Sequence, residues 1–354
     1  MVDVKIPPQL LAGAGLVDTG RTLPSREATS WLVRHESGLA VLRRLDPGLF
    51  RPDLSVVRRD LAWLHGYLDR LTAIGFPAPH PVAALDGASW LCRDDALWEL
   101  VSYLPGRIIG WDARPSMEEI GELLARYHDA AATTPRPAQR PVAYPLDTLP
   151  TRAAGAEVRG WLDALAADLA AIGHNNADRH VIHGDFTAHN VLAHGEPPVP
   201  VGVIDFALSY VDVLWADIGF GLWRSGRQQQ RAIELDLDRV CQLVTGYCRR
   251  RPLPPQAAPA ISVYVRARGL QQAVKGYDRG LSPRPRLVAR VRWLAEHRTI
   301  LEDRLASAIA GARSTMAARR PTPRGRPQRE TRDRGAEHRA QLGNTDGPDI
   351  GERL

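Results

Sequence analysis

The amino-acid sequence predicts an α+β fold in which a small N-terminal antiparallel sheet is followed by a larger, mainly helical part. Two observations lead to this prediction. Short strand-like runs with tight turns fill most of the chain before residue 104, and apolar residues at helical spacing dominate from Ser116 onward. The length of 354 residues, with 44% hydrophobic and 24% charged residues, is typical of a soluble globular protein with one large or two ordinary domains.

Three antiparallel strands are expected near the start of the chain, over residues 16–23, 29–35 and 39–45. In the third strand, Arg43 and Arg44 are adjacent and point to opposite faces, so only one of them can face a cleft. The apolar stripe of the next segment predicts a helix over residues 53–73, which ends at Gly75. Asp60 lies beside that stripe, where it can face the edge of the sheet.

A further strand pair is expected over residues 81–103, and the Pro-Gly pair at 105–106 ends it. The helical part then begins at Ser116, where a capping box with Glu119 is predicted. Apolar residues at helical spacing continue this helix, and His128 is expected to end it.

The remainder of the chain is predicted to be one long loop and a series of helices. The loop covers residues 131–150, which are rich in Pro, Thr and Arg, and helical segments are expected over residues 151–172, 213–223, 227–250, 256–277 and 287–311. From about Thr315 the composition changes to Arg, Pro, Gly and Gln, which predicts a disordered tail. The predicted domains are an N-terminal lobe, a C-terminal lobe and the tail, over residues 1–104, 105–314 and 315–354.

Charge, cysteine content and the length of apolar stretches argue against a nucleic-acid-binding, a disulfide-rich or a membrane-spanning protein. The formal net charge is +6, but the part from Met316 onward holds nine Arg and six acidic residues, so the folded body is only mildly basic. The high pI is therefore poor evidence for nucleic-acid binding. Three cysteines without metal-like spacing fit reduced thiols in the cytoplasm, and no apolar stretch is long enough to predict a membrane span.

A polar motif in the middle of the chain carries the predicted chemistry. Two short apolar runs around a six-residue loop at 195–200 predict a β-hairpin. With residue 194 opposite 201, Asn190 faces Asp205 at the roughly 4.5–5.5 Å separation of cross-strand neighbours. An amide oxygen and a carboxylate suit Mg²⁺, which shares its remaining sites with water and nucleotide phosphates. The alternative is that these residues form only a turn and a capped, buried strand.

The order of polar residues in this region matches a known phosphoryl-transfer arrangement. Asp185 lies five residues before Asn190, on the loop that enters the hairpin, and Asp205-Phe206 follows. This is similar to the catalytic loop of protein kinases, in which the first Asp receives the proton of the acceptor hydroxyl and the Asn and the later Asp hold metal.

The chain resembles the aminoglycoside phosphotransferase and choline kinase family of small-molecule kinases, which have a two-lobed, protein-kinase-like fold. Matching motifs extend from about Leu39 to Tyr277. The most specific of them are His183–Asn190, Val201–Phe206 and Asp217–Gly219, with support from Val41–Arg43, Tyr103–Gly106 and Leu123–His128. The stretch from Gly246 to Pro255 also looks like type II homoserine-kinase members of the same family.

The resemblance implies a role for each matching residue in catalysis and metal binding. Asp185 would accept the proton of the substrate hydroxyl or orient that hydroxyl, and Asn190 and Asp205 would bind Mg²⁺. His183 would fix the loop as a structural residue, with a general-base role as the lesser alternative. Asp217 would accept hydrogen bonds from the catalytic loop, with a helix N-cap as an equally good alternative.

The resemblance also implies an ATP site in the N-terminal lobe. Arg43 would hold the α- and β-phosphates in place of the more usual lysine, paired with Asp60. The backbone carbonyl of Ser102 and the amide of Leu104 would bind adenine. One departure from the family is that the loop around Ser25 lacks the glycines that let backbone amides approach phosphates. This puts the affinity for ATP and the choice between ATP and GTP in doubt.

The acceptor and the class of protein stay open at this point. Arginines on the later helices, such as Arg266 and Arg268, favour an acceptor with its own carboxylate or modest charge over a polycationic aminoglycoside, although solvated arginines on a helix are common. The leading interpretation is a small-molecule kinase that uses ATP and Mg²⁺. The alternatives are a nucleotide-binding pseudokinase or regulatory module, and a protein kinase, which the short segment between Asp205 and Asp217 disfavours.

Overall fold

A computed structural model describes residues 5–24, 28–45, 54–93, 96–109, 116–134, 155–275 and 284–319 of the chain. One compact unit spans Met1–Ala318. The predicted Ser25 site, most of the predicted loop at 131–150 and nearly all of the predicted tail lie outside the described residues.

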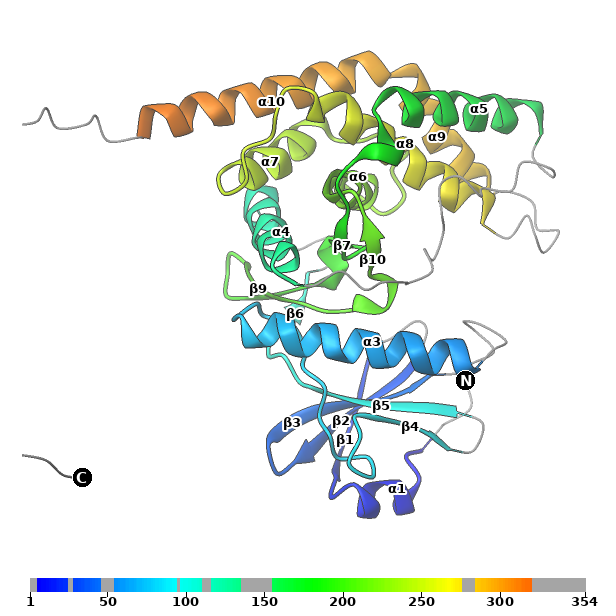
Figure 1. Cartoon of the computed structure of the whole chain (residues 1–354), viewed down its shortest axis with the longest axis vertical. Coiled ribbons are helices and arrows are strands. Elements are labelled where there is room, and N and C mark those ends of the chain that lie inside the picture. Colours follow the sequence, from blue (N-terminus) through cyan, green and yellow to red (C-terminus); the bar gives the residue numbers. More distant parts are fainter. Residues whose placement is uncertain are drawn as a thin grey trace, which may run out of the picture. The chain divides into compact units, whose positions relative to one another are not determined.

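The N-terminal region is a five-stranded antiparallel sheet in the order β1-β2-β3-β5-β4 (Figure 1). Its strands are β1 (Val17–Leu23), β2 (Ala28–His35), β3 (Gly38–Leu45), β4 (Trp90–Arg93) and β5 (Ala96–Ser102). Alternate side chains pack on opposite faces of the sheet. On one face Leu97 belongs to the same hydrophobic cluster as Leu64 of helix α3 (Leu54–Ala73), and on the other Trp98 belongs to a second cluster with Leu10 of helix α1 (Pro8–Gly13). All three N-terminal strands, the strand pair and the helix are therefore confirmed.

The C-terminal region is mainly helical. Its helices are α4 (Met117–Ala132), α5 (Ala156–Ala171), α6 (Leu214–Ser225), α7 (Leu237–Cys248), α8 (Ala257–Val274), α9 (Pro285–Glu296) and α10 (Arg298–Arg319). Five short strands complete it: β6 (Arg107–Ile108), β8 (Val191–His194) and β9 (Val199–Val203) form one sheet, and β7 (His180–Ile182) pairs with β10 (Tyr210–Asp212). The predicted α+β class, with a sheet first and helices after it, is confirmed. The exact lobe and tail boundaries stay predictions.

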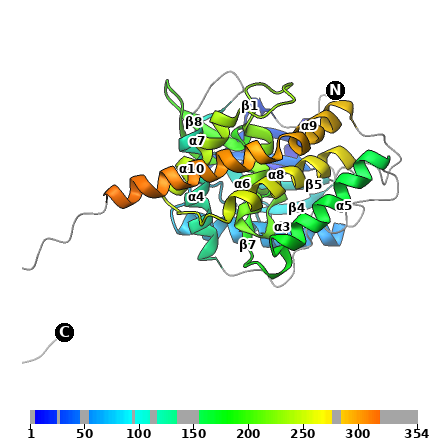
Figure 2. The same cartoon turned by 90° about the horizontal axis from the view of Figure 1, so that it is seen from above.

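The buried helices α6 and α8 lie at the centre of the helical region. Helix α8 packs against α6, α5 and α9, and Figure 2 shows it between α5 and α9.

Helices α4 and α7 approach each other closely at two glycines. A Cβ on Gly121 would lie 2.0 Å from Leu243 O, and a Cβ on Gly246 would lie 1.9 Å from Glu118 O. Only glycine permits this separation, so the two positions fix how closely α4 and α7 pack.

Several predicted helix ends are wrong, and each has a local cause. Ser116 is the N-cap residue of α4, but its side chain makes no capping hydrogen bond, so the predicted capping box is absent at this described position. Helix α4 also passes His128 and ends at Ala132, where the hydroxyl of Thr133 donates to Ala130 O. Helix α7 begins at Leu237 and not at 227, because the carboxylate of Asp236 accepts from two backbone amides and starts the helix there.

The predicted helix over 287–311 is two helices in the structure. Helix α9 ends at Glu296, His297 separates the two, and α10 runs from Arg298 to Arg319. The first residues of the segment predicted as a tail, from Thr315 to Arg319, therefore continue α10. Apolar spacing extends across His297 without interruption, which is why the sequence pattern predicted a single helix.

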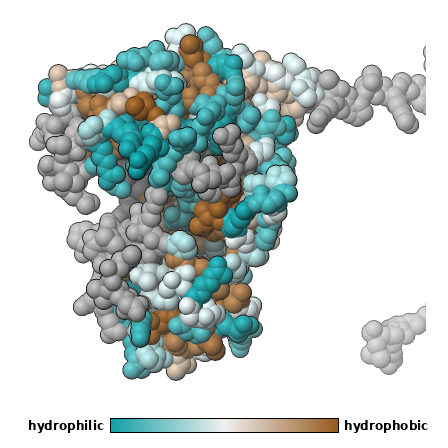
Figure 3. All heavy atoms as spheres, turned by 180° about the vertical axis from the view of Figure 1, so that it is seen from behind, coloured by the Kyte–Doolittle hydropathy of each residue, from teal (hydrophilic) through white to brown (hydrophobic). Residues whose placement is uncertain are grey.

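Hydrophobic residues on the face drawn in Figure 3 are scattered among hydrophilic ones. The large hydrophobic side chains that are most exposed belong to different elements, with Val17 on β1, Ile74 after α3 and Ile300 on α10. Among the described residues, no helix is both long and apolar enough to span a membrane.

Candidate active site

The predicted hairpin is present, but its register differs from the prediction. Val191 pairs with Val203, and the register shifts between Leu192 and Ala193, so the connecting turn covers 195–198 and not 195–200. The shift places one extra residue in β9, which is a β-bulge. As a result Ile204 follows opposite Asn190, and its amide donates to Asn190 O at 2.8 Å. The prediction that Asn190 lies directly opposite Asp205 is therefore wrong by one residue.

The catalytic loop, defined as His183–Asn190, is held by the buried carboxylate of Asp217. Its Oδ2 accepts from the backbone amide of His183 at 2.8 Å, and its Oδ1 accepts from the amide of Gly184 at 3.0 Å. Asp217 lies inside α6, after the N-cap residue Val213, and is completely buried. The helix N-cap alternative is therefore excluded, and these contacts support the predicted role in holding the loop.

His183 uses both ring nitrogens for contacts with the backbone. Its Nε2 lies 3.1 Å from Ile204 O, and a carbonyl oxygen only accepts, so this nitrogen carries the proton. The Nδ1 then accepts from the amide of Asp185 at 3.3 Å. The ring is fully buried against Phe206, with 4.7 Å between the ring centroids. These contacts fit a structural residue and leave no ring nitrogen for a general base.

The turn in the catalytic loop requires glycine at position 184. Gly184 has a φ of +76°, and a Cβ there would lie 2.4 Å from Leu208 O. The left-handed conformation and the close approach to the backbone both exclude other residues. This turn directs the side chain of Asp185 away from the buried strands.

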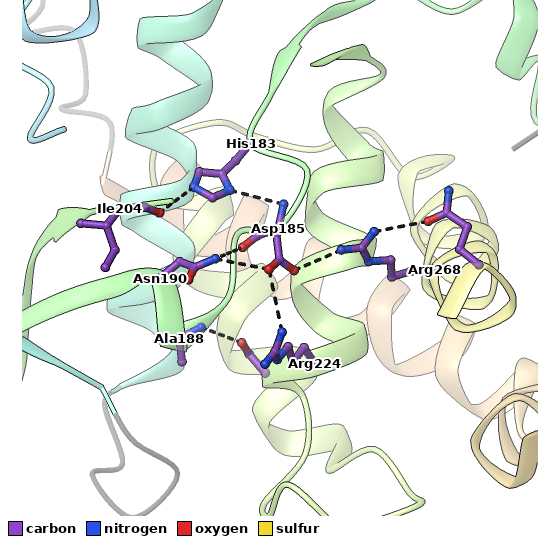
Figure 4. Close-up of polar contacts among 9 residues, drawn as sticks. His183, Asp185, Ala188, Asn190, Ile204, Arg224 and Arg268 are labelled. Atoms are coloured by element: carbon purple, nitrogen blue, oxygen red, sulfur yellow. Dashed lines mark hydrogen bonds and ion pairs between the residues drawn. The ribbon is translucent and has the colours of Figure 1, made fainter. Parts of the chain in front are cut away.

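Asp185 lies between the hairpin on one side and two arginines on the other (Figure 4). Asn190 Nδ2 donates to the Asp185 backbone carbonyl at 2.9 Å and is 3.3 Å from its Oδ2. Arg268 of α8 donates to Oδ1 at 3.1 Å, and Arg224 of α6 lies 3.8 Å from Oδ2. The carboxylate is partly exposed, at 15%. Its orientation is thus fixed by three side chains, while part of it stays accessible to a substrate.

Asn190 and Asp205 fit the predicted metal site chemically. Because Asn190 Nδ2 donates to Asp185, the amide oxygen is the atom left to bind a cation. Asp205 is exposed and has a left-handed φ of +65°, and within the described residues its carboxylate makes no hydrogen bond or ion pair. An amide oxygen and a carboxylate with no protein partner are ligands that Mg²⁺ accepts. Their roles stay proposals.

Arg43 contacts a buried carboxylate that sequence reasoning missed. Arg43 on β3 and Glu99 on β5 are cross-strand partners, and Arg43 Nη1 donates to Glu99 Oε1 at 2.6 Å. His65 of α3 lies on the other side of Glu99, with Nε2 3.8 Å from Oε2, and its Nδ1 is 2.6 Å from Ser89 Oγ. Burial opposes the charge on Glu99, but the charge of Arg43 and the hydrogen bonds and charge supplied by His65 and Arg43 together outweigh it and lower the pKa of Glu99 to about 2. A glutamate inside an otherwise apolar strand was the available signal.

The other predicted ATP-binding residues are placed as follows. Asp60 lies on α3 and is 3.7 Å from Arg59 in an ion pair; its pairing with Arg43 stays a prediction. Ser102 ends β5, and its Oγ accepts from His80 N at 3.0 Å. Among the described residues, the amide of Leu104 makes no hydrogen bond, which leaves it able to bind adenine. That role is also a proposal.

Glu99→Gln is expected to weaken the predicted ATP site around Arg43. The change removes the charge that orients Arg43, so kcat/KM for ATP should fall on the order of tenfold to a hundredfold because Arg43 loses its fixed position. Steady-state kinetics at varied ATP measures this. The matched control is Glu196→Gln, which breaks the exposed ion pair with Arg107 and should leave kcat/KM unchanged. Equal kinetics for both variants would contradict the assignment of Glu99.

His128 is a second residue whose role the sequence did not predict. It is fully buried between α4, α6 and α7, with Nε2 3.3 Å from Asp217 Oδ2 and Nδ1 2.8 Å from the hydroxyl of Tyr247. Burial lowers the pKa of His128 below 6.5, despite the opposing effect of Asp217. The neutral ring donates to Asp217 and accepts from Tyr247, so it connects the carboxylate that holds the loop to α7.

The stability of the protein is expected to fall as the pH falls below 6.5. In this range the unfolded state protonates His128 while the folded state, with its lowered pKa, does not, so the unfolded state binds more protons and is favoured. The titration of His128 should change the free energy of unfolding by up to about 1.4 kcal/mol per pH unit. Urea unfolding between pH 7.5 and 5.5 measures it, and His128→Gln should flatten the slope. The exposed His194→Gln serves as control, and an unchanged slope in His128→Gln would contradict this explanation.

The chain matches one protein family over most of its described length. Residues 19–253 match a family described as the phosphotransferase enzyme family, and this segment contains Arg43, Glu99, Asp185, Asn190 and Asp205. A homoserine kinase from Methylobacillus glycogenes is 30% identical over 217 residues, which cover 59% of this chain and 66% of that protein. The chain therefore spans just under two thirds of the length of this relative.

Solved structures with the same fold are more distant in sequence. A microcompartment-associated aminopropanol kinase is 18% identical with a TM-score of 0.55, covering 84% of this chain and 92% of that one. An amicoumacin kinase in complex with AMP-PNP, Ca²⁺ and Ami is 17% identical with a TM-score of 0.57, covering 80% and 87%. These likenesses establish the fold.

Proposed function

Since the chain belongs to the phosphotransferase enzyme family, we propose that it transfers the γ-phosphoryl group of ATP to a hydroxyl group of a small molecule. The observation that carries this proposal is the geometry of Asp185. Its carboxylate is oriented by Asn190, Arg224 and Arg268, on a loop that Asp217 holds through two backbone amides. Such fixed positioning is the main requirement for catalysis of phosphoryl transfer.

The proposed reaction is a direct transfer. The acceptor oxygen attacks the γ-phosphorus, a new O–P bond forms as the bond to the β-phosphate oxygen breaks, and ADP leaves. The proton of the hydroxyl passes to the carboxylate of Asp185. Asn190 and Asp205 would hold Mg²⁺, which supplies positive charge to the phosphates when it is bound. Arg43, oriented by Glu99, would bind the α- and β-phosphates.

The relatives indicate which acceptors should be tested first. The relatives include a homoserine kinase and an aminopropanol kinase, so we place small compounds that carry both an amino group and a hydroxyl first among the candidate acceptors. Aminoglycosides and other antibiotics, sugars and choline complete the set. A complex of a structural neighbour with AMP-PNP supports ATP as the donor. A cytoplasmic location, where ATP is available, is part of the same proposal.

Acceptor-dependent release of ADP tests the function. Purified protein is incubated with Mg-ATP and a panel of homoserine, aminopropanol, choline, sugars and aminoglycosides, and ADP is measured by a coupled assay. We expect one class of small hydroxyl compound to raise ADP release far above the rate without acceptor. If ATP binds but no acceptor raises the rate, a nucleotide-binding pseudokinase or regulatory module replaces this proposal. Transfer to proteins alone would point to a protein kinase.

A further inference from the structure

Two arginines, Arg227 just after α6 and Arg290 on α9, lie over the ring of Trp223, and a third, Arg224, follows Trp223 in the sequence. We call Arg224, Arg227 and Arg290 the arginine cluster. The guanidinium carbon of Arg227 lies 4.4 Å from the centroid of the Trp223 ring, and that of Arg290 lies 6.0 Å from it. Arg224 is the next residue after Trp223 and contacts Asp185. The cluster therefore reaches from the catalytic carboxylate to α9.

Arg227 is buried to an extent that is unusual for an arginine. Only 1% of it is exposed, and it is the largest of the fully buried side chains among the described residues. Its Nε donates to Ile233 O at 3.3 Å, but within the described part of the chain Nη1 and Nη2 have no hydrogen-bond partner. A buried guanidinium normally has a carboxylate or another acceptor for these atoms, because its removal from water is unfavourable.

Within the described part of the chain, the two members of the cluster that lie over Trp223, Arg227 and Arg290, have no carboxylate partner. Arg290 donates to the backbone carbonyls of Ala232 and Gln230, at 2.9 Å and 2.5 Å, and among the described residues neither Arg227 nor Arg290 forms an ion pair. Burial and the charge of Arg290 lower the pKa of Arg227 to about 9. The pKa of Arg290 is lowered by its burial and by other arginines. Both side chains are charged near neutral pH, so the region is suited to bind an anion.

The cluster is attached to the catalytic loop by short contacts. The hydroxyl of Ser225, next to Arg224, accepts from the amide of Ala188 at 3.0 Å. A Cβ on Gly221 of α6 would lie 2.7 Å from Phe186 O, so helix and loop are in direct contact there. The Trp223 ring packs on Gly269, beside Arg268. Figure 4 shows Arg268 on the side of Asp185 away from Asn190, and Arg224 near Ala188. Through Arg224, the cluster is connected to the carboxylate of Asp185.

We propose that the acceptor carries an oxyanion group, a carboxylate or a phosphate, which binds to Arg227 and Arg290 while its hydroxyl lies at Asp185. This inference rests on the proposed kinase function and specifies its substrate class. The oxyanion supplies the acceptors that Arg227 Nη1 and Nη2 lack, and a guanidinium binds both groups in a bidentate manner. Because Arg224 of the same cluster contacts Asp185 and its charge acts on Arg290, we expect one small acceptor to reach both groups. A polycation such as an aminoglycoside is disfavoured at this site.

Matched pairs of acceptors test the proposal directly. Homoserine is compared with homoserinol, in which a neutral hydroxymethyl group replaces the carboxylate, and glycerol 3-phosphate is compared with glycerol. We expect kcat/KM to be at least tenfold higher for the anionic member of one pair, and which pair responds distinguishes a carboxylate from a phosphate. Equal kcat/KM within both pairs overturns the oxyanion proposal but leaves the kinase function in place. No turnover of any acceptor in the wider panel contradicts the kinase function itself.

Arg227→Met tests the residue. Methionine keeps an unbranched side chain against Trp223 and removes the buried charge, so the fold should be retained. The preference for the anionic acceptor should fall at least tenfold, through a higher KM. Arg292→Met removes a charge from an exposed position of α9, where Arg292 pairs with Glu157, and should leave the preference unchanged. An unchanged preference in Arg227→Met would overturn the assignment.

A binding measurement keeps the assignment testable without turnover. Inorganic sulfate should raise the melting temperature of the wild-type protein and of Arg292→Met in a saturable manner, at constant ionic strength. The shift should be absent in Arg227→Met. An equal shift in all three proteins would show that sulfate binds elsewhere and would contradict the proposed site.

Discussion

Asp185→Ala is expected to reduce phosphoryl transfer by roughly a thousandfold or more, because the acceptor hydroxyl loses the group that orients it and takes its proton. Binding of Mg-ATP should change little, since the proposed phosphate and metal ligands are Arg43, Asn190 and Asp205. Single-turnover kinetics with saturating acceptor measures the first quantity, and isothermal titration with a non-hydrolysable ATP analogue measures the second. The combination separates a catalytic role from a role in nucleotide binding.

The neighbouring arginines make a second variant necessary. Removal of the Asp185 carboxylate leaves Arg268, which is nearly buried, without its 3.1 Å partner, so part of the loss in Asp185→Ala can come from disturbed packing. Asp185→Asn keeps the shape and loses the charge, and it should be nearly as inactive with an unchanged melting temperature. Asp163→Ala, at an exposed position of α5, is the control. Activity of Asp185→Asn within a few-fold of wild type would refute the catalytic assignment.

Asp217→Ala is expected to destabilise the protein by roughly 3–5 kcal/mol, the typical result of removing one partner from a buried charged network. Three donors lose their acceptor: the amides of His183 and Gly184 and the ring of His128. None of them can reach water, because Asp217 and its surroundings are fully buried. Urea unfolding monitored by circular dichroism measures the change.

The position of the catalytic loop provides an independent readout of the same variant. Where enough folded Asp217→Ala is obtained at low temperature, its kcat should fall far more than its affinity for ATP, because the loop that positions Asp185 is no longer held. Asp238→Ala on α7 removes an exposed carboxylate that pairs with Arg304 and should change neither quantity. Stability of Asp217→Ala close to that of Asp238→Ala would show that the buried network does not hold the loop.

Local features of the sequence were sufficient for the main elements and for the central motif. Strands β2 and β3 and helix α3 follow from alternating and helical patterns that act over a few residues. The motif of His183, Asp185 and Asn190 is equally local, and the contacts of the His183 ring with Ile204 O and the Asp185 amide support its predicted role in fixing the loop. Errors occurred where a single contact decides an end, as at Asp236, whose carboxylate begins α7 ten residues after the predicted start.

Register within the hairpin also depends on more than the apolar pattern. The bulge in β9, opposite Leu192 and Ala193, changes by one residue which position of β9 lies opposite Asn190. Asp205 itself has a left-handed backbone conformation, which affects the direction of its carboxylate. Pro200 lies in β9 and not in the turn, as part of the pairing with Ala193. Loop length alone therefore could not give the correct register.

The sequence by itself determined the α+β class, the family and the residues proposed for phosphoryl transfer, because these depend on short patterns and on a motif within a few tens of residues. Only the tertiary structure decided which charged side chains contact one another. Glu99 reaches Arg43 across 56 residues through the strand order β3-β5, and Arg268 reaches Asp185 across 83 residues through the packing of α8 on α6. The burial of Arg227 against Trp223 likewise follows only from the tertiary structure. Electrostatic contacts depend on distance and burial, which the packing of distant segments sets and local sequence does not.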